Sequence, residues 1–258
     1  MKKLFFAVIL LVPTALFAQS PFDGTWKTNF DQSKLSPKPI VFSLSNGMYE
    51  CTSCAPKFNV KADGSDQAVT GQAYDTIAVK EVDAHTIHVV AKKNGKTAWE
   101  QTRTTSQDGK TLNVKTTSYP PNSTQPVTAE VILGREGTPA SGANATSGSW
   151  KIQKVSESEN GLLVTYKGTG NELSMSSSTG SGWTAKLDGK DYPVKGDYGV
   201  DSVSIKRIDD RTVEATYKRG GKLMSVDRIT VSADGKTLTT VSDYKPTDRV
   251  STYVATKQ

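Results

Sequence analysis

Hydrophobic residues recur at every second position over many short segments of this chain. In the segments 77–80, 87–91, 203–205 and 213–217, Ile, Val, Ala or Tyr stands at alternate positions. A period of two places one set of side chains on one face of a β-strand, whereas a helix needs a period of about 3.6. The pattern predicts strands with one apolar face.

Short turn sequences separate these predicted strands. The stretches "KNGK", "RGGK", "QDGK" and "ADGK" supply residues that tolerate the positive φ of two-residue hairpin turns, and "VDAHT" and "IDDRT" join the strands before them. Successive strands are therefore expected to pair as antiparallel neighbours. Such a meander has two unpaired edges, and closure into a barrel removes both.

The chain repeats itself once. The stretch "DTIAVKEVDAHTIHVVAKKNGKT", from Asp75, aligns without gaps with "DSVSIKRIDDRTVEATYKRGGKL", from Asp201, and the alignment continues into "SQDGKTLNV" and "SADGKTLTT". The pairs "DGTW" with "SGSW" and "ADGSDQAVTG" with "LDGKDYPVKG" extend it upstream. We interpret the sequence as a tandem duplication of one domain.

The repeat sets the expected domain boundaries. We predict a signal peptide over 1–18, a first barrel over 19–135, a linker rich in Gly, Ala and Ser over 136–147, and a second barrel over 148–258. Each copy has room for about eight to ten strands of ordinary length. The predicted fold class is all-β, with two tandem antiparallel up-and-down barrels.

Both copies begin with glycine two residues before tryptophan and end near a basic residue. Gly24 and Trp26 open the first copy, which ends with Arg135; Gly148 and Trp150 open the second copy, which ends with Lys257. A cation stacked on an indole at the closed end of a barrel stabilises it by about 0.5–2 kcal/mol. These residues resemble the closed end of lipocalin and calycin barrels, and the resemblance implies structural barrel floors that do not contact ligand.

These features resemble lipocalin and calycin barrels, and the whole chain resembles secreted bacterial lipocalin-like proteins. In that family a Gly-x-Trp on the first strand is covered by a basic side chain from the last strand. The resemblance implies a barrel that binds small apolar molecules, but it does not identify the ligand. Lys257 stacks less well than arginine, so the resemblance predicts a looser floor in the second barrel.

The N-terminus has the features of an export signal. Lys2 and Lys3 precede the apolar run "LFFAVILLVPTALFA", which ends in the small residue Ala18. Removing this signal leaves 30 basic and 26 acidic residues, a formal charge of +4. Acids and bases alternate, so we expect no nucleic-acid partner. No second long apolar segment follows the signal, so we expect no membrane span. We predict a periplasmic or extracellular location; the sequence does not indicate the oligomeric state.

The two cysteines are separated by two residues. Cys51 and Cys54 in "ECTSCAP" are compatible with redox exchange, metal ligation or a disulfide. Redox exchange of the thioredoxin type needs a helix after the first cysteine, and zinc needs two more ligands. His85 and His88 are the only histidines, and on a strand they point to opposite faces. In an oxidising compartment we favour the disulfide.

No motif assigns an enzyme activity, a cofactor or a metal. The "DGSD" and "DGKD" stretches place Asp63, Asp66, Asp188 and Asp191 around glycine, but no calcium-binding loop of the required spacing is present. Turn capping is the favoured role of these carboxylates. Distant acidic residues that meet only in the fold would leave no local motif.

Aromatic residues within strands are the candidates for a ligand cavity. Five were selected: Tyr49, Phe58, Trp99, Trp183 and Tyr198. We therefore predict an exported non-catalytic protein that binds a small apolar or amphipathic, lipid-like ligand. The alternatives are a protein or polysaccharide interaction module with packed barrels, a calycin-type isomerase or cyclase with a buried carboxylate or histidine, and a single membrane barrel built from both copies.

Overall fold

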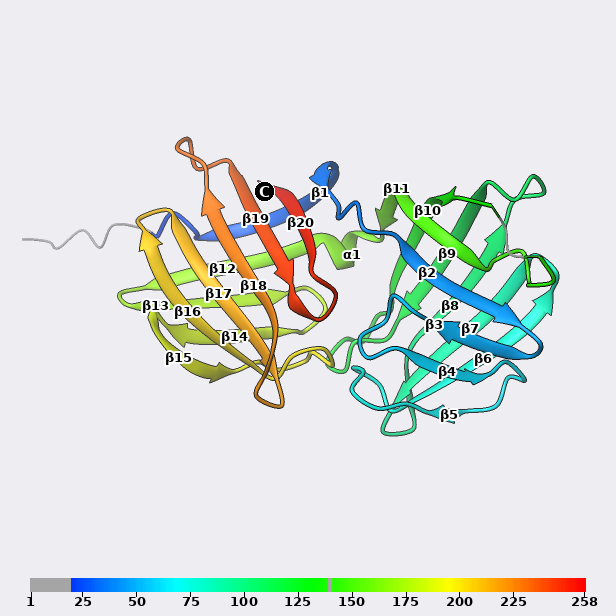
Figure 1. The fold of residues 1–258 in the computed structure, drawn as a ribbon. Helices are drawn as coiled ribbons and strands as arrows, with labels where there is room; N and C mark the ends of the chain where they lie inside the picture. Colours follow the sequence, from blue (N-terminus) through cyan, green and yellow to red (C-terminus); the bar gives the residue numbers. More distant parts are fainter. Residues whose placement is uncertain (1–19, 139–140) are drawn as a thin grey trace, which may run out of the picture.

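The chain forms two nearly closed antiparallel β-barrels that lie side by side (Figure 1). The computed structural model describes residues 20–138 and 141–258, so the predicted signal peptide over 1–18 lies outside the described residues. Each barrel is one sheet of ten strands, which confirms the all-β tandem-barrel prediction. The alternative prediction of a single membrane barrel built from both copies is wrong, because the strands form two separate sheets.

We call the barrel that contains most of the first repeat the N-barrel. Its strands, in spatial order, are β4 (Phe58–Lys61), β3 (Met48–Cys51), β2 (Ile40–Ser45), β11 (Gly148–Glu157), β10 (Val127–Glu136), β9 (Thr111–Ser118), β8 (Lys96–Thr105), β7 (Thr86–Lys93), β6 (Thr76–Asp83) and β5 (Gln67–Ala68). An isolated bridge between Asp63 and Lys80 brings the ends of this sheet together.

The second sheet is called the C-barrel. Its strands, in spatial order, are β14 (Gly182–Lys186), β13 (Glu172–Ser177), β12 (Leu163–Thr169), β1 (Gly24–Lys34), β20 (Arg249–Lys257), β19 (Thr237–Tyr244), β18 (Lys222–Val231), β17 (Thr212–Arg219), β16 (Ser202–Asp209) and β15 (Asp188–Pro193). Backbone hydrogen bonds between Gly182 and Lys195, at 3.0 and 2.9 Å, nearly close it.

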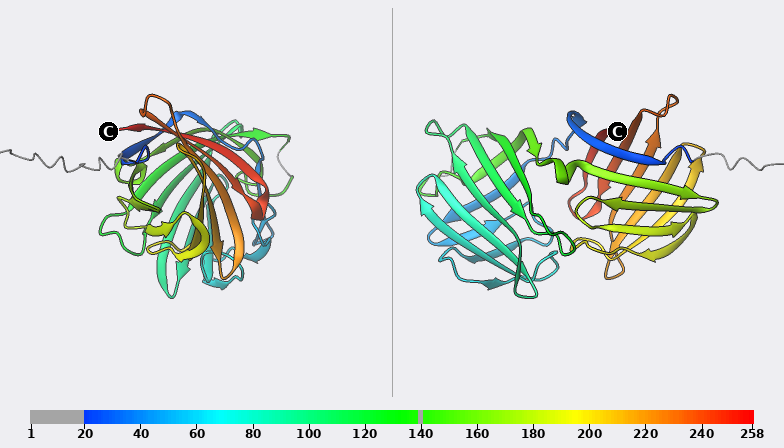
Figure 2. Two further views of the ribbon diagram at one scale, coloured as in Figure 1. Left: turned by 90° about the vertical axis from the view of Figure 1, so that its left-hand side faces the viewer. Right: turned by 180° about the vertical axis from the view of Figure 1, so that it is seen from behind.

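The two barrels exchange their first strands. β1 comes from the first repeat but pairs with β12 and β20 of the C-barrel, and β11 comes from the second repeat but pairs with β2 and β10 of the N-barrel. Figure 2 shows the blue β1 within the barrel of yellow and red strands. Each barrel therefore differs from the predicted boundaries 19–135 and 148–258 by one strand, because equivalent strands of the repeat occupy each other's places.

Two short segments carry the chain between the barrels. Residues 35–39 join β1 to β2, and residues 158–162, which include the short helix α1 (Glu159–Leu162), join β11 to β12. The predicted linker over 136–147 instead joins β10 to β11 within the N-barrel. Asn144 Nδ2 donates to Glu81 Oε1 and to the Asp83 carbonyl, both at 2.8 Å, and Thr146 is fully buried. The described part of the predicted linker is therefore packed against the N-barrel and differs from a flexible connector.

The hairpin turns have the predicted backbone. Asn94 and Gly95 both have positive φ, as do Gly220 and Gly221 at the equivalent turn of the second repeat. In "SQDGKTL", Ser106 Oγ donates to Asp108 Oδ1 at 2.7 Å, and in "SADGKTL" Ser232 Oγ donates to Asp234 Oδ1 at 2.6 Å. The two repeated sequence segments therefore form the same turn, once in each barrel.

The tryptophan floors are present, with their partners crossed between the repeats. Lys257 Nζ lies 5.3 Å from the centroid of the Trp26 ring, and Arg135 Cζ lies 4.0 Å from that of Trp150. A Cβ at Gly24 would meet Lys257 Cε at 2.6 Å, so the cation needs glycine there. The expected pairing of Trp26 with Arg135 and of Trp150 with Lys257 is corrected by the strand exchange.

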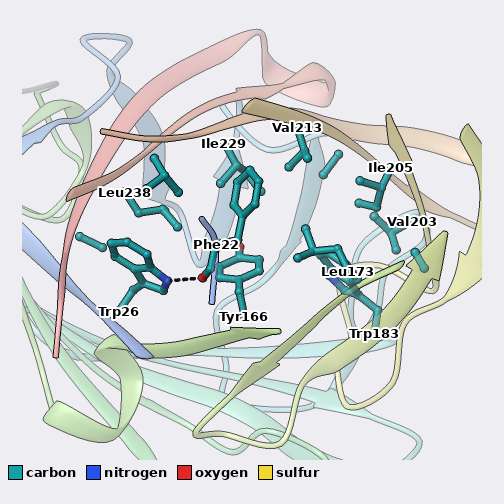
Figure 3. Packing of buried hydrophobic residues seen from close by; sticks show 14 residues of the cluster. Phe22, Trp26, Tyr166, Leu173, Trp183, Val203, Ile205, Val213, Ile229 and Leu238 are labelled. Atoms are coloured by element: carbon teal, nitrogen blue, oxygen red, sulfur yellow. Dashed lines mark hydrogen bonds between the residues drawn. The ribbon is translucent and has the colours of Figure 1, made fainter. Parts of the chain in front are cut away.

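Each barrel has its own apolar core. Figure 3 shows that of the C-barrel, in which Trp26 Nε1 donates to the Phe22 carbonyl at 2.9 Å. In the N-barrel Trp150 Nε1 makes the equivalent bond to Thr146 at the same length. Both indoles are fully buried, and both polar atoms have a partner. Trp26 and Trp150 therefore anchor the two cores.

Candidate functional site

The open ends of the two barrels face each other. In the C-barrel, β1 starts and β20 ends beside the Trp26 floor, so Arg249, the first residue of β20, lies at the opposite end. In the N-barrel, β11 starts and β10 ends beside the Trp150 floor. Both crossing segments leave from the ends opposite the floors. The open end of each barrel, opposite its floor, thus faces the other barrel.

A cavity of about 490 Å³ lies where these two ends meet. Its walls come from the inner faces of both barrels and from the crossing segment. The residues are Leu35, Ser36, Ile40, Phe42, Tyr49, Cys51, Ser53, Cys54, Arg103 and Ile152 on one side and Ser242, Tyr244, Arg249, Ser251 and Tyr253 on the other. The strand exchange therefore builds one shared cavity from two barrels.

Arg103 is the charged group of the N-barrel that faces this cavity. Its neighbours across the sheet, Ile87 and Val114, are both buried, so strand alternation turns Arg103 inward. Its guanidinium carbon lies 4.7 Å from the ring centroid of Phe42 and 5.9 Å from that of Tyr49. Among the ion pairs of the described residues, none involves Arg103.

The guanidinium of Arg103 is held by neutral groups. Nη1 donates to Tyr49 Oη at 2.9 Å, and Nε and Nη2 donate to Gln101 Oε1 at 3.0 and 2.8 Å. These contacts use three of the five N–H donors and leave one on each terminal nitrogen. Two donors in this arrangement match the two oxygens of a carboxylate or a similar anion.

Arg249 is the second cation of the cavity and comes from the C-barrel. Its terminal nitrogens donate to the carbonyl oxygens of Lys38 and Pro39 in the crossing segment 35–39. Burial lowers the pKa of Arg249 below its ordinary value. Because its donors hold the crossing segment, we assign it a structural role in closing this side of the cavity.

The cysteine pair forms part of the cavity wall. The sulfur atoms of Cys51 and Cys54 lie 1.99 Å apart, which is bonding distance. Cys51 is buried at the end of β3, and both residues line the cavity. The bridge encloses Ser53, whose Oγ accepts a bond from Val41 N at 2.9 Å. The disulfide thus fixes the loop that walls the cavity beside Arg103.

A second hollow, of about 360 Å³, is lined by residues of both barrels. Trp99 of the N-barrel and Tyr198 of the C-barrel both line it, as does Tyr74, which meets Trp99 edge-on at 5.5 Å between ring centroids. Burial and the neighbouring Tyr49 raise the pKa of Tyr74, while the charge of Arg103 lowers it. Tyr74 therefore lines the second hollow and lies within electrostatic range of Tyr49 and Arg103 of the first cavity.

The five predicted ligand-contacting residues do not form one site. Tyr49 lines the first cavity, and Trp99 and Tyr198 line the second hollow. Phe58 packs beside Tyr49, at 6.2 Å between ring centroids. Trp183 is 5% exposed in the core of the C-barrel, where Nε1 donates to Tyr217 Oη at 3.2 Å.

Sequence reasoning missed the polar residues of the cavity. Arg103 was not selected because nothing in its local sequence marks it as inward-facing. The signal was available, however, in the alternation of Trp99, Gln101 and Arg103 along one strand. Tyr244 and Tyr253 could not have been placed by any local pattern, because they reach this cavity only through the arrangement of the barrels.

Asp227 is an inward-facing carboxyl group of the C-barrel. It lies opposite the buried Ala215 and opposite Ser242, whose Oγ donates to Asp227 Oδ1 at 2.7 Å. Burial raises its pKa above the ordinary value, and the hydroxyls of Ser242 and Ser225 act in the other direction. A buried carboxyl group of this kind is the feature that the alternative of a calycin-type isomerase or cyclase requires.

The four aspartates around glycine act as turn and ion-pair residues. Asp63 Oδ1 accepts a bond from Ser65 N at 2.8 Å, and Asp188 Oδ1 accepts one from Lys190 N at 3.0 Å. The other two pair with lysines: Asp66 with Lys92 and Asp191 with Lys218, each at 2.7 Å. Within 20–138 and 141–258 no three His, Cys, Asp or Glu side chains are grouped to hold a metal ion.

No protein-family profile matches the sequence, and searches of curated proteins and of solved structures give no match either. No helix of the described part of the chain is long and apolar enough to cross a membrane.

Proposed function

We propose that this chain is an exported, lipocalin-like protein that binds a small amphipathic molecule in the cavity between its two barrels. The observation that carries the proposal is the Arg103 guanidinium, which lies against two aromatic rings and faces the cavity without a carboxylate partner among the described ion pairs. The volume of about 490 Å³ falls within the range of about 300–1,000 Å³ common for ligand sites.

The chemistry of the walls indicates an anionic head and an apolar body. The two free donors of Arg103 suit a carboxylate, and a hydrogen bond to a charged group contributes about 1.5–3 kcal/mol. Phe42, Ile40 and Ile152 provide apolar surface next to this cation. A fatty acid or another carboxylate with an alkyl or aromatic body fits both properties.

The outer surface favours ligand binding in a cavity over the alternative of a protein or polysaccharide interaction module. A module would expose aromatic patches on the outer faces of the barrels. In the described residues, the exposed large aromatic side chains are Tyr119 and Tyr244, and both line the hollows between the barrels. The four tryptophans are buried or partly buried.

A second candidate, an isomerase or cyclase that acts on the bound molecule, is favoured by Asp227. Its raised pKa inside the C-barrel meets the expectation stated for that activity. The two histidines are not beside it, since His88 lies 3.7 Å from Glu100 and His85 lies in the turn before β7. Conversion of the bound molecule by the parent protein, and its loss in Asp227→Asn with binding retained, would establish this candidate.

The binding test compares dodecanoate with dodecanol by titration calorimetry. We expect dodecanoate to bind better, and Arg103→Met to weaken its binding at least tenfold, since about 1.4 kcal/mol corresponds to a factor of ten. Arg228→Met is the matched control because Arg228 is exposed on the outer face of β18. Denaturation curves establish that each variant is folded. Equal affinity of parent and Arg103→Met for dodecanoate would contradict the proposal.

The export part of the proposal has its own test. We expect the protein made in its native cell to be recovered from the periplasm or the medium, with an N-terminus near residue 19. N-terminal sequencing of the recovered protein checks this. Recovery from the cytoplasm with Met1 and Lys2 retained would contradict it.

A further inference from the structure

The equivalent strands β8 and β18 carry polar side chains on the inner walls of their barrels. In the alignment of the repeats, Asp75 corresponds to Asp201, so Gln101 corresponds to Asp227 and Arg103 to Ile229. Gln101 and Arg103 face inward from β8, and Asp227 faces inward from the equivalent strand β18. One barrel thus presents a cation to the shared cavity, and the other carries a carboxyl group whose partner Ser242 lines the same cavity.

The carboxyl group of Asp227 is connected to the shared cavity through Ser242. Ser242 lines the cavity, and its hydroxyl donates to Oδ1 of Asp227 at 2.7 Å. The side chain is largely enclosed but keeps some accessible surface. Because Asp227 faces into the barrel, this surface is reached from the interior.

Asp227 has acceptor capacity that the described residues do not use. No ion pair of the described residues includes it, and the hydroxyls of Ser242 and Ser225 beside it use only part of the roughly four acceptor sites of a carboxylate. The phenols of Tyr166 and Tyr217 are close enough for the charge of Asp227 to raise their pKa values. A buried acceptor in an otherwise aromatic wall is a position at which a ligand donor contributes strongly to binding.

We propose that the cavity binds its ligand in one direction, with an anionic end at Arg103 and a hydrogen-bond donor, a hydroxyl or an ammonium group, at Asp227 and Ser242. This inference rests on the proposed function, because it assumes an amphipathic anion in the same cavity. It narrows the ligand class to molecules with polar groups at both ends of an apolar body, such as ω-hydroxy or ω-amino carboxylates.

The test uses titration calorimetry of the full mature chain with alkanoates, ω-hydroxyalkanoates and ω-aminoalkanoates over a series of chain lengths. We expect at least one ω-substituted acid to bind about tenfold more tightly than the plain acid of equal length, which is the effect of one hydrogen bond to a buried carboxyl group. Comparing the ω-hydroxyalkanoates with the ω-aminoalkanoates shows whether a hydroxyl or an ammonium group is the preferred donor.

Variants assign this preference to Asp227. Asp227→Leu removes the acceptor at similar volume, so the ratio of affinities between an ω-substituted acid and the plain acid of equal length should fall to about one. Asp227→Asn keeps an oxygen acceptor but loses the charge. It should therefore abolish any preference for ω-aminoalkanoates and retain part of any preference for ω-hydroxyalkanoates. Asp191→Leu, on the outer surface beside Lys218, is the control.

The outcomes separate this inference from the proposed function. Plain alkanoates that bind through Arg103, with no ω-substituted acid preferred at any length, would overturn the inference alone. A preference that survives in Asp227→Leu would also overturn it. Failure of every acid to bind would overturn both. If Asp227→Leu proves unfolded by circular dichroism, Ser242→Ala provides the deciding measurement, and an unchanged preference in it would overturn the inference.

Discussion

Lys257 covers the indole of Trp26, its ammonium nitrogen 5.3 Å from the ring centroid, although the two residues stand at opposite ends of the described chain. The equivalent contact between Arg135 and Trp150 spans far fewer residues and includes three hydrogen bonds from the guanidinium, to the carbonyl oxygens of Gly109, Ala145 and Ser147. The C-barrel floor is thus held by the more distant and less extensively bonded pair. Both contacts depend on the exchange of β1 and β11 between the repeats.

Fragments cut at different boundaries should behave differently. Residues 40–157 contain all ten strands of the N-barrel, so this fragment should fold as a monomer with one cooperative transition. Residues 19–135 contain β1 in place of β11, joined to β2 by a segment with Pro37 and Pro39. We expect them to form a dimer that exchanges β1. Light scattering after size exclusion measures both masses. A monomeric 19–135 as stable as 40–157 would be incompatible with the strand exchange.

Double-mutant cycles should detect the crossed floors. Trp26→Ala and Trp150→Ala should each lower the free energy of unfolding by about 3–5 kcal/mol, because each empties a fully buried indole site. Trp26→Ala and Lys257→Ala should couple by about 0.5–2 kcal/mol, whereas Trp26→Ala and Arg135→Ala should be additive. Urea denaturation supplies all the values. Coupling of Trp26 to Arg135 in place of Lys257 would show that the strands are not exchanged.

The disulfide should stabilise the cavity wall modestly. Replacing both Cys51 and Cys54 with serine should lower the free energy of unfolding by about 2 kcal/mol, the chain-entropy value for so short a loop. Thiol titration of the unreduced parent should find no free thiol, in agreement with the bonded sulfurs. Two titratable thiols in the native protein would disprove the bridge. The double variant in reducing and non-reducing buffer is the control, and its stability should be the same in both.

Asp227 should give the protein a specific pH dependence. Burial raises the pKa of its carboxyl group above 3.8, so the folded state keeps this proton to a higher pH than the unfolded chain does. Between the two pKa values the folded state binds more protons, and stability falls as pH rises. Asp227→Asn removes this loss, so its stability relative to the parent should increase as the pH rises through the range above about pH 4.

Thermal denaturation across that range measures the difference for Asp227→Asn. The exposed Asp191→Asn variant corrects for the substitution itself. A difference between parent and Asp227→Asn that stays constant with pH would show that the carboxyl titrates alike in the folded and unfolded states.

The local features of the fold could be predicted from sequence, because alternation and turn residues act over a few positions. The hairpin at Asn94 and Gly95 is one example, and the contact of each Gly-x-Trp with a basic residue is another. The partner of each tryptophan could not be predicted. β1 and β11 are equivalent strands, so either satisfies the same neighbours. Pro37 and Pro39, which disfavour a tight turn between β1 and β2, were the available signal.

The candidate site was less predictable than the fold. Tyr49 was selected as an aromatic within a strand, and it does line the cavity. Its partner Arg103 and the facing Ser242 belong to different barrels, and no periodic pattern in either repeat indicates that the barrel mouths meet. Trp183 was selected on the same grounds as Tyr49 but fills a core, because alternation reports which face is inward and not whether that interior is empty.

The pairing of β1 with β20 also determines the order in which this chain can be completed. β1 is the first strand to be synthesised, but its neighbours β12 and β20 belong to the second repeat, and β20 begins only at Arg249. At about 5–20 residues per second, β1 stays without its β20 neighbour for roughly ten to forty seconds of synthesis. During that interval it is an exposed edge able to pair with another nascent chain. Crowded synthesis should therefore yield interlocked oligomers unless the nascent strand is shielded.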